Sequence, residues 1–187
     1  MEDWSMTRYI ALLRGVNVGG KNRVVMATLK ARFEQHGFKD VSTYLNSGNV
    51  IFSSEGRDVL QLTEDCEKLI EAEFGLKIIV TIVSAKELLE ALEQMPEWWN
   101  VDKESKHNVI FVIPPTTTEE VINSVGEAKI EYEKVAHHER VIFWSAPIKT
   151  FSRSRWSKIV GTKMYSRITI RNANTVNKLA ELVQKNN

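Results

Sequence analysis

Two kinds of segment alternate along this chain, and the order in which they alternate occurs twice. Runs of β-branched and aromatic residues predict strands, whereas apolar residues three or four positions apart, such as Met26, Leu29 and Phe33, predict helices. Gly37 and Gly75 each follow the last apolar turn of such a helix, where glycine commonly ends one. The first half therefore has the order β-α-β-β-α-β, at residues 7–14, 24–36, 41–45, 49–53, 57–74 and 76–83.

The second half repeats this order, with one additional helix on each side. The repeat predicts an α+β protein of two tandem ferredoxin-like (βαββαβ) subdomains with antiparallel sheets, plus extra linking and C-terminal helices. We expect a tail at 1–6, the first subdomain at 7–83, a linking helix and irregular segment at 84–107, and the second subdomain with its C-terminal helix at 108–187. The expected elements of the second half are residues 84–94, 108–113, 118–125, 129–136, 140–145, 152–160, 166–171 and 174–184.

Two predicted strands of the first half, residues 7–14 and 76–83, are apolar on both faces. The expected topology places helices on only one face of the sheet, yet strands of this kind are normally covered on both. We therefore expect the other face to be covered by the second half, by an extra helix or by a second subunit.

Composition excludes several classes of protein. Hydrophobic residues make up 43% of the 187 and charged residues 26%, as in globular proteins and unlike disordered or fibrous ones. No apolar run approaches the ~20 residues of a membrane span, and the first residues show no signal-peptide pattern. Cys66 is the one cysteine, so no internal disulfide can form. We expect a cytoplasmic protein in which Cys66 is buried and unreactive.

Charge is distributed unevenly along the chain. Residues 1–96 carry 11 basic and 14 acidic side chains, whereas residues 97–187 carry 14 and 10. Nine basic residues lie between Arg140 and Ala180, with no acidic residue among them. This asymmetry predicts contact with an anionic partner. The alternative is a solvated face that pairs with the acidic first half.

The segment from Gly15 to Asn22 has the spacing G-x-x-x-x-G-K and lies between a predicted strand and a predicted helix. In phosphate-binding loops of this spacing, backbone amides surround the phosphate and the lysine adds charge. Asn22 stands where those loops carry the Ser or Thr that holds magnesium, and the expected sheet is antiparallel. We therefore expect an anion-binding loop of a looser kind, or a structural turn, rather than a nucleotide hydrolase. Residues 44–49 leave the same two alternatives, ligand contact or turn.

Residues 151–158 combine hydroxyls, guanidinium groups and an aromatic ring near an expected helix start. Free amides at a helix start favour an anion, and arginine suits phosphate or carboxylate. Trp156 either stacks on a nucleic-acid base or lies in the core beneath a Ser-capped basic helix.

The sequence shows no motif of a known catalytic or metal site. His36 and His107 are isolated, and His137 and His138 are expected at the tip of a hairpin; none has the spacing of metal ligands. We expect neither a metal nor a cofactor, and whether the protein is an enzyme stays open.

Several motifs together resemble one bacterial family. They are Arg-Gly-Val-Asn-Val-Gly-Gly-Lys-Asn at 14–22, Met26, Tyr-Leu-Asn-Ser-Gly-Asn-Val at 44–50, Ser154, Lys158, and Thr-Ile-Arg-Asn-Ala-Asn-Thr-Val at 169–176. In this order they resemble the family catalogued as domain of unknown function 1697. The resemblance implies a soluble bacterial α+β protein of two ferredoxin-like subdomains, and it implies no activity. Ala173 stands where the family usually has Trp, and the missing ring predicts an altered pocket or a loss of function.

If the two halves pack together, the polar segments 15–22, 46–49 and 171–174 are expected to line one cleft. Our leading hypothesis is a cytosolic protein that binds nucleic acid or a phosphate-bearing metabolite through these loops and the basic second half. We expect no contact with a membrane, and a homo-oligomer is possible. The expected ligand-binding residues are Arg14, Asn17, Gly19, Gly20, Lys21, Ser47, Asn49, Arg153, Arg155, Lys158, Arg171, Asn172 and Asn174.

Two other functions remain open from the sequence. One is an enzyme acting on a phosphorylated small molecule, with His137, His138 or a carboxylate in the cleft as the general base. The other is a structural or protein-interaction module, which an exposed apolar patch at Trp98, Trp99 or Trp144 would favour.

Overall fold

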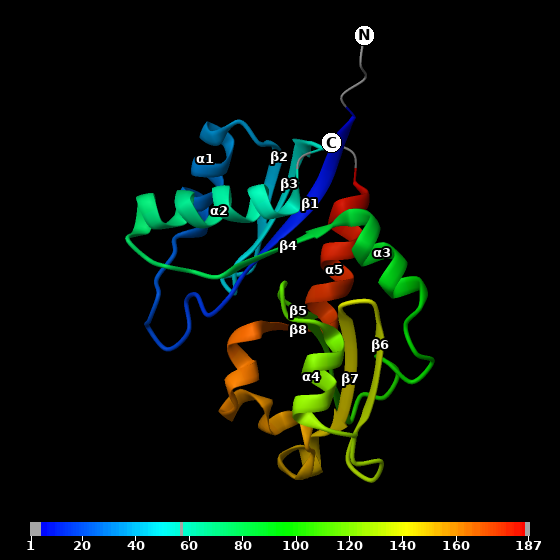
Figure 1. The fold of residues 1–187 in the computed structure, drawn as a ribbon. Helices are drawn as coiled ribbons and strands as arrows, with labels where there is room; N and C mark the ends of the chain where they lie inside the picture. The colour runs from blue at the N-terminus through cyan, green and yellow to red at the C-terminus, as the bar shows by residue number, and fades with distance from the viewer. Residues whose placement is uncertain (1–4, 57, 186–187) are drawn as a thin grey trace. The chain divides into compact units, whose positions relative to one another are not determined.

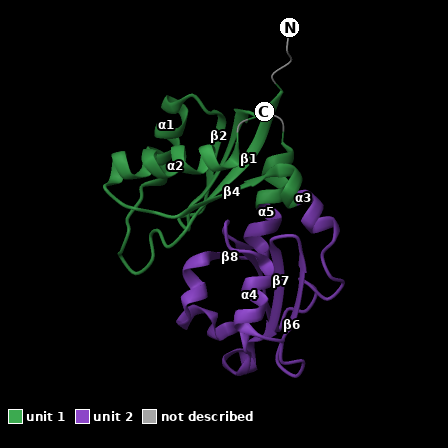
Figure 2. Cartoon of the chain, in the orientation of Figure 1, with its two compact units in different colours: residues 1–88, 179–187 green, residues 89–178 purple. Residues whose placement is uncertain are grey.

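Both halves of the chain form a four-stranded antiparallel sheet accompanied by helices, which confirms the expected α+β class (Figure 1). The computed structural model describes residues 5–56 and 58–185. The chain divides into two compact units, residues 1–88 with 179–187 and residues 89–178 (Figure 2). No helix among the described residues combines the length and the apolar character needed to cross a bilayer.

The sheet of the first unit has the strand order β2-β3-β1-β4, with every neighbouring pair antiparallel. One helix connects β1 to β2 and a second connects β3 to β4, so both connections leave and re-enter the same sheet. The elements are β1 (Met6–Leu13), α1 (Met26–His36), β2 (Lys39–Tyr44), β3 (Asn49–Glu55), α2 (Val59–Phe74) and β4 (Val80–Ser84).

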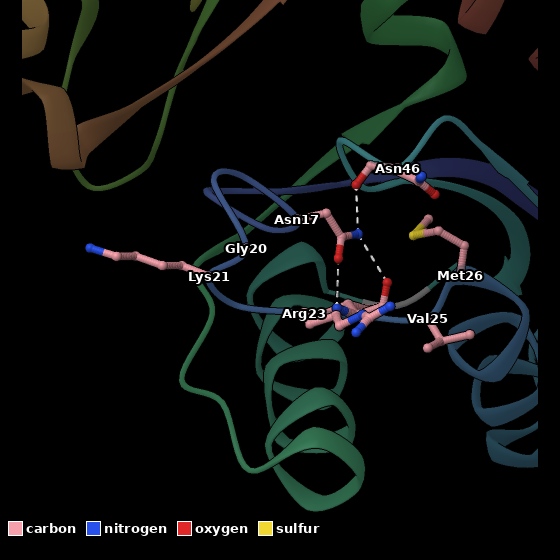
Figure 3. A pocket seen from close by; sticks show the side chains of 8 residues that line it. Asn17, Gly20, Lys21, Arg23, Val25, Met26 and Asn46 are labelled. Atoms are coloured by element: carbon pink, nitrogen blue, oxygen red, sulfur yellow. Dashed lines mark hydrogen bonds between the residues drawn. The ribbon is translucent and has the colours of Figure 1, made fainter.

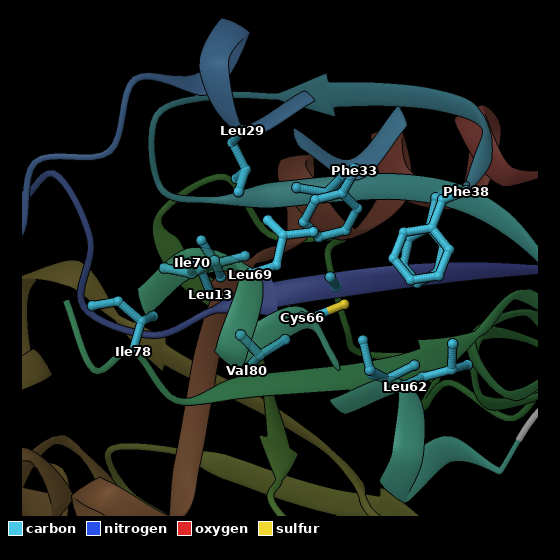
Figure 4. Close-up of a cluster of buried hydrophobic side chains, with 14 of the residues drawn as sticks. Leu13, Leu29, Phe33, Phe38, Leu62, Cys66, Leu69, Ile70, Ile78 and Val80 are labelled. Carbon is cyan, nitrogen blue, oxygen red and sulfur yellow. The ribbon is translucent and has the colours of Figure 1, made fainter. Parts of the chain in front are cut away.

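Alternate side chains of these strands pack against the buried faces of α1 and α2 (Figure 4). Three aromatic rings contact one another, with ring centroids 4.5–5.5 Å apart: Phe33 of α1, Phe38 just before β2, and Phe52 of β3. Cys66 of α2 lies in the same cluster, as expected, and its burial raises the pKa of its thiol well above the ordinary value. The thiol therefore stays protonated and weakly nucleophilic. Residues 9–13 of β1 are buried on both faces of the strand, also as expected.

The ends of the helices are set by local chemistry. Gly37 and Gly75 end α1 and α2 in the left-handed conformation, with φ of +107° and +66°, which glycine adopts without steric cost. The Asp58 carboxylate accepts the Leu60 amide and caps the start of α2. In the second unit Thr117 and Glu120 form a reciprocal capping box at the start of a helix over residues 118–125, the range predicted from the sequence.

The sheet of the second unit has the strand order β6-β7-β5-β8, again entirely antiparallel. Trp144 of β7, Trp156 and Ile159 belong to the hydrophobic cluster on its helix-covered face. The elements are α3 (Ala85–Glu93), β5 (Ser105–Val112), α4 (Thr118–Val125), β6 (Lys134–His138), β7 (Val141–Pro147), the 3₁₀ segments η1 (Ile148–Arg153), η2 (Trp156–Gly161) and η3 (Lys163–Arg167), β8 (Ile168–Asn172) and α5 (Ala173–Gln184).

Some element boundaries and one element type differ from the sequence prediction. The apolar run at 76–83 becomes a strand only from Val80, and the predicted strand at 129–136 begins at Lys134, after a turn at residues 129–133. His137 and His138 lie in β6, and the hairpin tip is formed by Glu139 and Arg140 instead. Glu139 has a φ of +50°, which a two-residue hairpin turn requires.

The expected helix at 152–160 forms short 3₁₀ segments instead of an α-helix. Five of its first seven residues are Ser or Arg, and the hydroxyls of Ser154 and Ser157 donate to carbonyls three residues earlier. Such local hydrogen bonds compete with regular α-helical bonding and stabilise turn-like geometry.

Candidate ligand-binding site

The glycine-rich segment after β1 folds into a tight turn. Val18 and Lys21 form an isolated antiparallel bridge in which the Lys21 amide donates to the Val18 carbonyl at 3.0 Å. Gly19 and Gly20, the two residues between them, have φ of +57° and +76°. Positive φ at both central positions is the type I′ geometry, which glycine adopts at little cost.

Asn17 joins this turn to two other parts of the first unit. Its side-chain Nδ2 donates to the Val24 carbonyl at 2.9 Å and to the Asn46 carbonyl at 2.8 Å, while its Oδ1 accepts the Val24 amide at 2.8 Å (Figure 3). The Asn22 side chain donates to the Gly15 carbonyl at 3.0 Å and closes the base of the segment. The predicted proximity of segments 15–22 and 46–49 is therefore observed within this unit.

A pocket of about 490 Å³ lies where these segments meet the start of α1 (Figure 3). Val25 precedes α1 without a side-chain cap, and the first turn of α1 has no acidic residue. The exposed Lys21 and Arg23 line the pocket, and Lys21 extends away from the other labelled side chains. Residues 17, 20, 21, 23–26 and 46 form its lining.

The groups around this pocket carry positive charge. The first amides of an α-helix have no partner inside the helix and, with the helix dipole, give its N-terminus a partial positive charge. At α1 no carboxylate of the first turn neutralises that charge, and two cationic side chains border the same pocket. The pocket therefore has the properties that favour an anion.

The turn itself differs from a phosphate-cradling loop. The amides of Asn17 and Lys21 already donate to the carbonyls of Asn22 and Val18. Helix α1 begins at Met26, four residues after the segment ends at residue 22. Within the pocket, the positive charge comes from Lys21, Arg23 and the helix start.

Other residues predicted from the first half have structural partners. The buried side chain of Asn49 donates to the Tyr44 carbonyl at 2.7 Å and to the Ser47 hydroxyl at 3.1 Å, which fixes the turn between β2 and β3. The half-buried Arg14 donates its backbone amide to Ile79, beside the sheet. Neither Asn49 nor Arg14 is among the residues that line the pocket.

In the second unit Trp156 is buried, so of the two alternatives left open by the sequence the structure supports the core position and not stacking on a nucleic-acid base. Its ring belongs to the hydrophobic cluster beneath η2 and its Nε1 donates to the Gly126 carbonyl at 3.2 Å. A carboxylate of the same chain also occupies the start of η2. The buried Glu133 accepts the amides of Arg155 and Trp156 at 2.6 and 2.9 Å, and the amide of Lys129 at 3.1 Å.

The basic residues of the second unit lie on both sides of its sheet. Arg153 and Lys158 are exposed, and Arg155 donates from Nη1 to the Glu127 carbonyl. Ile168 and Ile170 of β8 pack in the same cluster as Trp156. Because strand side chains alternate between faces, Arg171 points to the face opposite η2. The sheet therefore separates Arg171 from the basic 3₁₀ segments.

Residues 171–174 form no loop, which corrects the expectation of a third polar loop. Arg171 and Asn172 end β8, and α5 begins at once with Ala173 and Asn174. The Asn172 side chain accepts the Thr175 amide and caps α5. Arg171 donates to the Thr169 hydroxyl at 2.9 Å, and its burial lowers the pKa of the guanidinium to about 10, so it remains charged at neutral pH.

Sequence reasoning missed Arg23, Val25 and the Asn46 carbonyl as members of the pocket. Arg23 carried a usable signal, a second cation two residues after Lys21 and just before a helix start. The Asn46 carbonyl carried none, because it enters through the bond from Asn17, 29 positions earlier. Within residues 5–56 and 58–185, no three His, Cys, Asp or Glu side chains are grouped to hold a metal ion.

Comparison with known proteins places this fold and pocket in a family. A family model described as "Protein of unknown function (DUF1697)" matches residues 6–143, most of the chain and all of the segments that form the pocket. The chain belongs to the DUF1697 family. Its residues 169–176, part of the resemblance seen in the sequence, lie beyond the matched range. Ala173 is buried in the first turn of α5.

A solved structure supports this assignment. The conserved bacterial protein SP0830 from Streptococcus pneumoniae is 31% identical to this DUF1697 chain and superposes with a TM-score of 0.86. The similarity covers 96% of this chain and 100% of the Streptococcus pneumoniae chain. No curated protein matches the chain.

Proposed function

We propose that this DUF1697 protein binds a phosphate-bearing small molecule in the pocket at the start of α1. The observation that carries the proposal is the meeting of an uncapped helix start with two exposed cations, Lys21 and Arg23, around one pocket. A volume of about 490 Å³ lies within the range of small-molecule sites and is suited to a nucleotide or a sugar phosphate.

The parts of the pocket suggest how such a ligand would be oriented. The phosphate would lie against the first amides of α1, with Arg23 and Lys21 balancing its charge. The apolar part of the lining, Val24, Val25 and Met26, would contact the uncharged part of the ligand. The Asn17 side chain donates hydrogen bonds to the Val24 and Asn46 carbonyls, so it would fix the positions of these two parts of the pocket lining rather than contact the ligand itself.

Nucleic acid is the second candidate ligand, and one observation favours it. Arg153 and Lys158 are exposed within a stretch that holds no acidic residue from Arg140 to Ala180. Contacts between such side chains and a phosphate backbone would release counterions, so binding would weaken steeply with salt. A patch at Trp99 or Trp144, which would have favoured an interaction module, is not supported, because both side chains are buried.

Thermal stability measured with single ligands tests the proposal. A ligand at 100 times its dissociation constant adds about 2.7 kcal/mol, which for a chain of this size raises the melting temperature by about 5–10 °C. The panel contains inorganic phosphate, nucleotides, sugar phosphates and short oligonucleotides. We expect the rise with a small phosphate ester and expect the Lys21→Ala/Arg23→Ala double variant to lose most of it.

The matched control is Lys68→Ala/Lys77→Ala, which removes the same charge from exposed positions of the same unit outside this pocket. An equal loss of binding in the control would mean that only net charge matters, and the pocket assignment would be wrong. A response to oligonucleotides alone, abolished by salt and by Arg153→Ala/Lys158→Ala, would support nucleic acid instead.

The topology of the two sheets supports a proposal about the subdomains. Each has the strand order 2-3-1-4 in the numbering of its own unit, with crossover segments after its first and third strands. We propose that they are two tandem ferredoxin-like subdomains, at 7–83 and from 108 onward, joined by the segment 84–107. The buried, unpaired Cys66 suits a reducing compartment, and we propose that the protein works in the cytoplasm.

A further inference from the structure

A serine and a histidine face each other in the second unit, on the side of its sheet opposite η2. His107 of β5 and Ser145 of β7 are direct cross-strand partners, so their side chains project from the same face of the sheet. The Ser145 Oγ lies 2.6 Å from the His107 Nδ1. This distance is that of a strong hydrogen bond between a hydroxyl and an imidazole nitrogen.

The neighbouring backbone fixes which imidazole nitrogen carries the proton. The Asn100 amide, which can only donate, lies 3.0 Å from Nδ1, so Nδ1 is an acceptor. The Asp102 carbonyl, which can only accept, lies 2.5 Å from Nε2, so Nε2 is protonated. Both contacts require the same tautomer. Its Nδ1 lone pair is shared by the Asn100 amide and the Ser145 hydroxyl, so transfer of the serine proton to Nδ1 requires the Asn100 hydrogen bond to break.

The loop before β5 is built to hold this imidazole. Asn100, which presents its amide to the ring, has a φ of +61°, a left-handed conformation that asparagine adopts more readily than most residues. The Asp102 carboxylate accepts the Ser105 hydroxyl and the Glu104 amide. These two hydrogen bonds, together with the charges of His107 and Lys134, hold the pKa of Asp102 below its usual value.

Ser145 and His107 line a pocket of about 250 Å³ that lies within the second unit. Trp98, Ile130 and Pro147 give the pocket an apolar side, and Lys134 places a cation on its wall. The nucleophile–base pair therefore adjoins a space large enough for a small acyl group rather than being sealed in the core.

We propose that Ser145 and His107 form a nucleophile–base pair that hydrolyses a small carboxylic ester in this pocket. The Ser145 Oγ forms a bond to the ester carbonyl carbon while its proton passes to the His107 Nδ1, and Lys134 balances the negative charge on the carbonyl oxygen. The carbon–oxygen bond to the leaving alcohol then breaks, and the alcohol takes the proton from His107. Water, deprotonated by His107, releases the carboxylic acid from Ser145 and restores the serine hydroxyl.

The charges around the pocket define the substrate class. Asp102, Glu131 and Glu133 line it together with Lys134 as the cation. Glu133 is balanced by three backbone amides, whereas the Asp102 and Glu131 side chains are exposed. The surroundings disfavour an anionic ester, so the substrate is a neutral or positively charged one. This pocket shares no lining residue with the pocket at α1, so either proposal can fail alone.

Covalent labelling of the unaltered protein tests the pair. A neutral alkyl fluorophosphonate reacts with a base-activated serine as its phosphorus–oxygen bond forms and fluoride leaves. We expect mass spectrometry to place the adduct on Ser145, with none on the exposed Ser124 of α4. Ser145→Ala should abolish the adduct and the hydrolysis of p-nitrophenyl acetate, whereas Ser124→Ala should change neither.

The role of the histidine is measured separately. His107→Gln should slow labelling about 100-fold, the usual contribution of a general base, and circular dichroism confirms that the variant folds. Failure of the unaltered chain to label at Ser145, or labelling of His107→Gln at the unaltered rate, would overturn the proposal in favour of a structural hydrogen bond. The adduct at Ser145 is measured on the unaltered protein. A variant that fails to fold therefore cannot decide the outcome.

Discussion

At the scale of single residues, Gly48 shows how backbone space constrains the turn before β3. It has a φ of +88° and is buried, and its carbonyl accepts the Leu13 amide at 2.8 Å. A Cβ atom at this position would lie 2.7 Å from the Leu13 Cβ and 2.8 Å from the Val16 Cγ2. Neither neighbouring atom is the end of a long flexible side chain, so the backbone itself would have to shift.

We expect Gly48→Ala to destabilise the protein by about 2–4 kcal/mol, because the positive φ and the overpacking both oppose a side chain. Urea unfolding followed by circular dichroism measures the change. Gly75→Ala is the control, since Gly75 also has a positive φ but a Cβ there meets nothing within 4 Å; we expect it to cost about 1 kcal/mol. Equal losses for the two variants would contradict the steric argument.

Residue types alone did not separate ligand contacts from structural contacts. Asn17 and Asn49 both had the composition of a binding loop, yet the hydrogen bonds of their amides hold loops together. Asparagine offers one acceptor and two donors, which serve a backbone turn as well as a ligand. Lys21 and Arg23 are better evidence of a ligand, because exposed cations beside a pocket contribute little to folding.

At the scale of elements, one carboxylate organises the irregular region that follows β7. Glu133 is buried and its two oxygens accept three backbone amides, two of them at the start of η2. A short 3₁₀ segment has few internal hydrogen bonds, so this carboxylate replaces those that a longer helix would supply. The sequence predicted an anion at this position, and the structure shows that the chain supplies its own.

Glu133→Ala should therefore destabilise the second unit by about 3 kcal/mol, because one buried and two partly buried amides lose a charged acceptor. Hydrogen exchange is the measurement, and we expect faster exchange at the amides of Lys129, Arg155 and Trp156. Glu131→Ala, an exposed glutamate two residues away, should leave these rates unchanged. Similar exchange in the two variants would mean that η2 is held by its apolar contacts alone.

At the scale of the whole molecule, the chain passes from the first unit to the second and then returns. Residues 89–178 form the second unit, and residues 179–187 group with residues 1–88 again. The first change takes place inside α3 (Ala85–Glu93) and the second inside α5 (Ala173–Gln184), so each of these two helices belongs to both units. Val176 and Leu179 of α5 are both buried.

This division predicts that two substitutions three residues apart in α5 affect different units. Leu179→Ala removes buried volume from the first unit and should cost about 2–5 kcal/mol. We expect hydrogen exchange to rise in β1 and β3 in this variant, and in β5 and β8 in Val176→Ala, because stability in such proteins is lost by cooperative units. The same exchange pattern in both variants would show that the chain unfolds as one body.

The sequence by itself determined the order of the eight strands and five α-helices that the structure describes, because these follow from local periodicity and capping chemistry, but it did not predict the 3₁₀ segments between β7 and β8. The helix over 118–125 was predicted to its boundaries, and Gly37 and Gly75 were predicted as helix ends. Only the tertiary structure decided the sites. The pocket at α1 depends on a bond from Asn17 to Asn46, and the pairing of His107 with Ser145 depends on a strand register that joins positions 38 apart. Such contacts are set by chain folding over long separations, for which local residue patterns carry no signal.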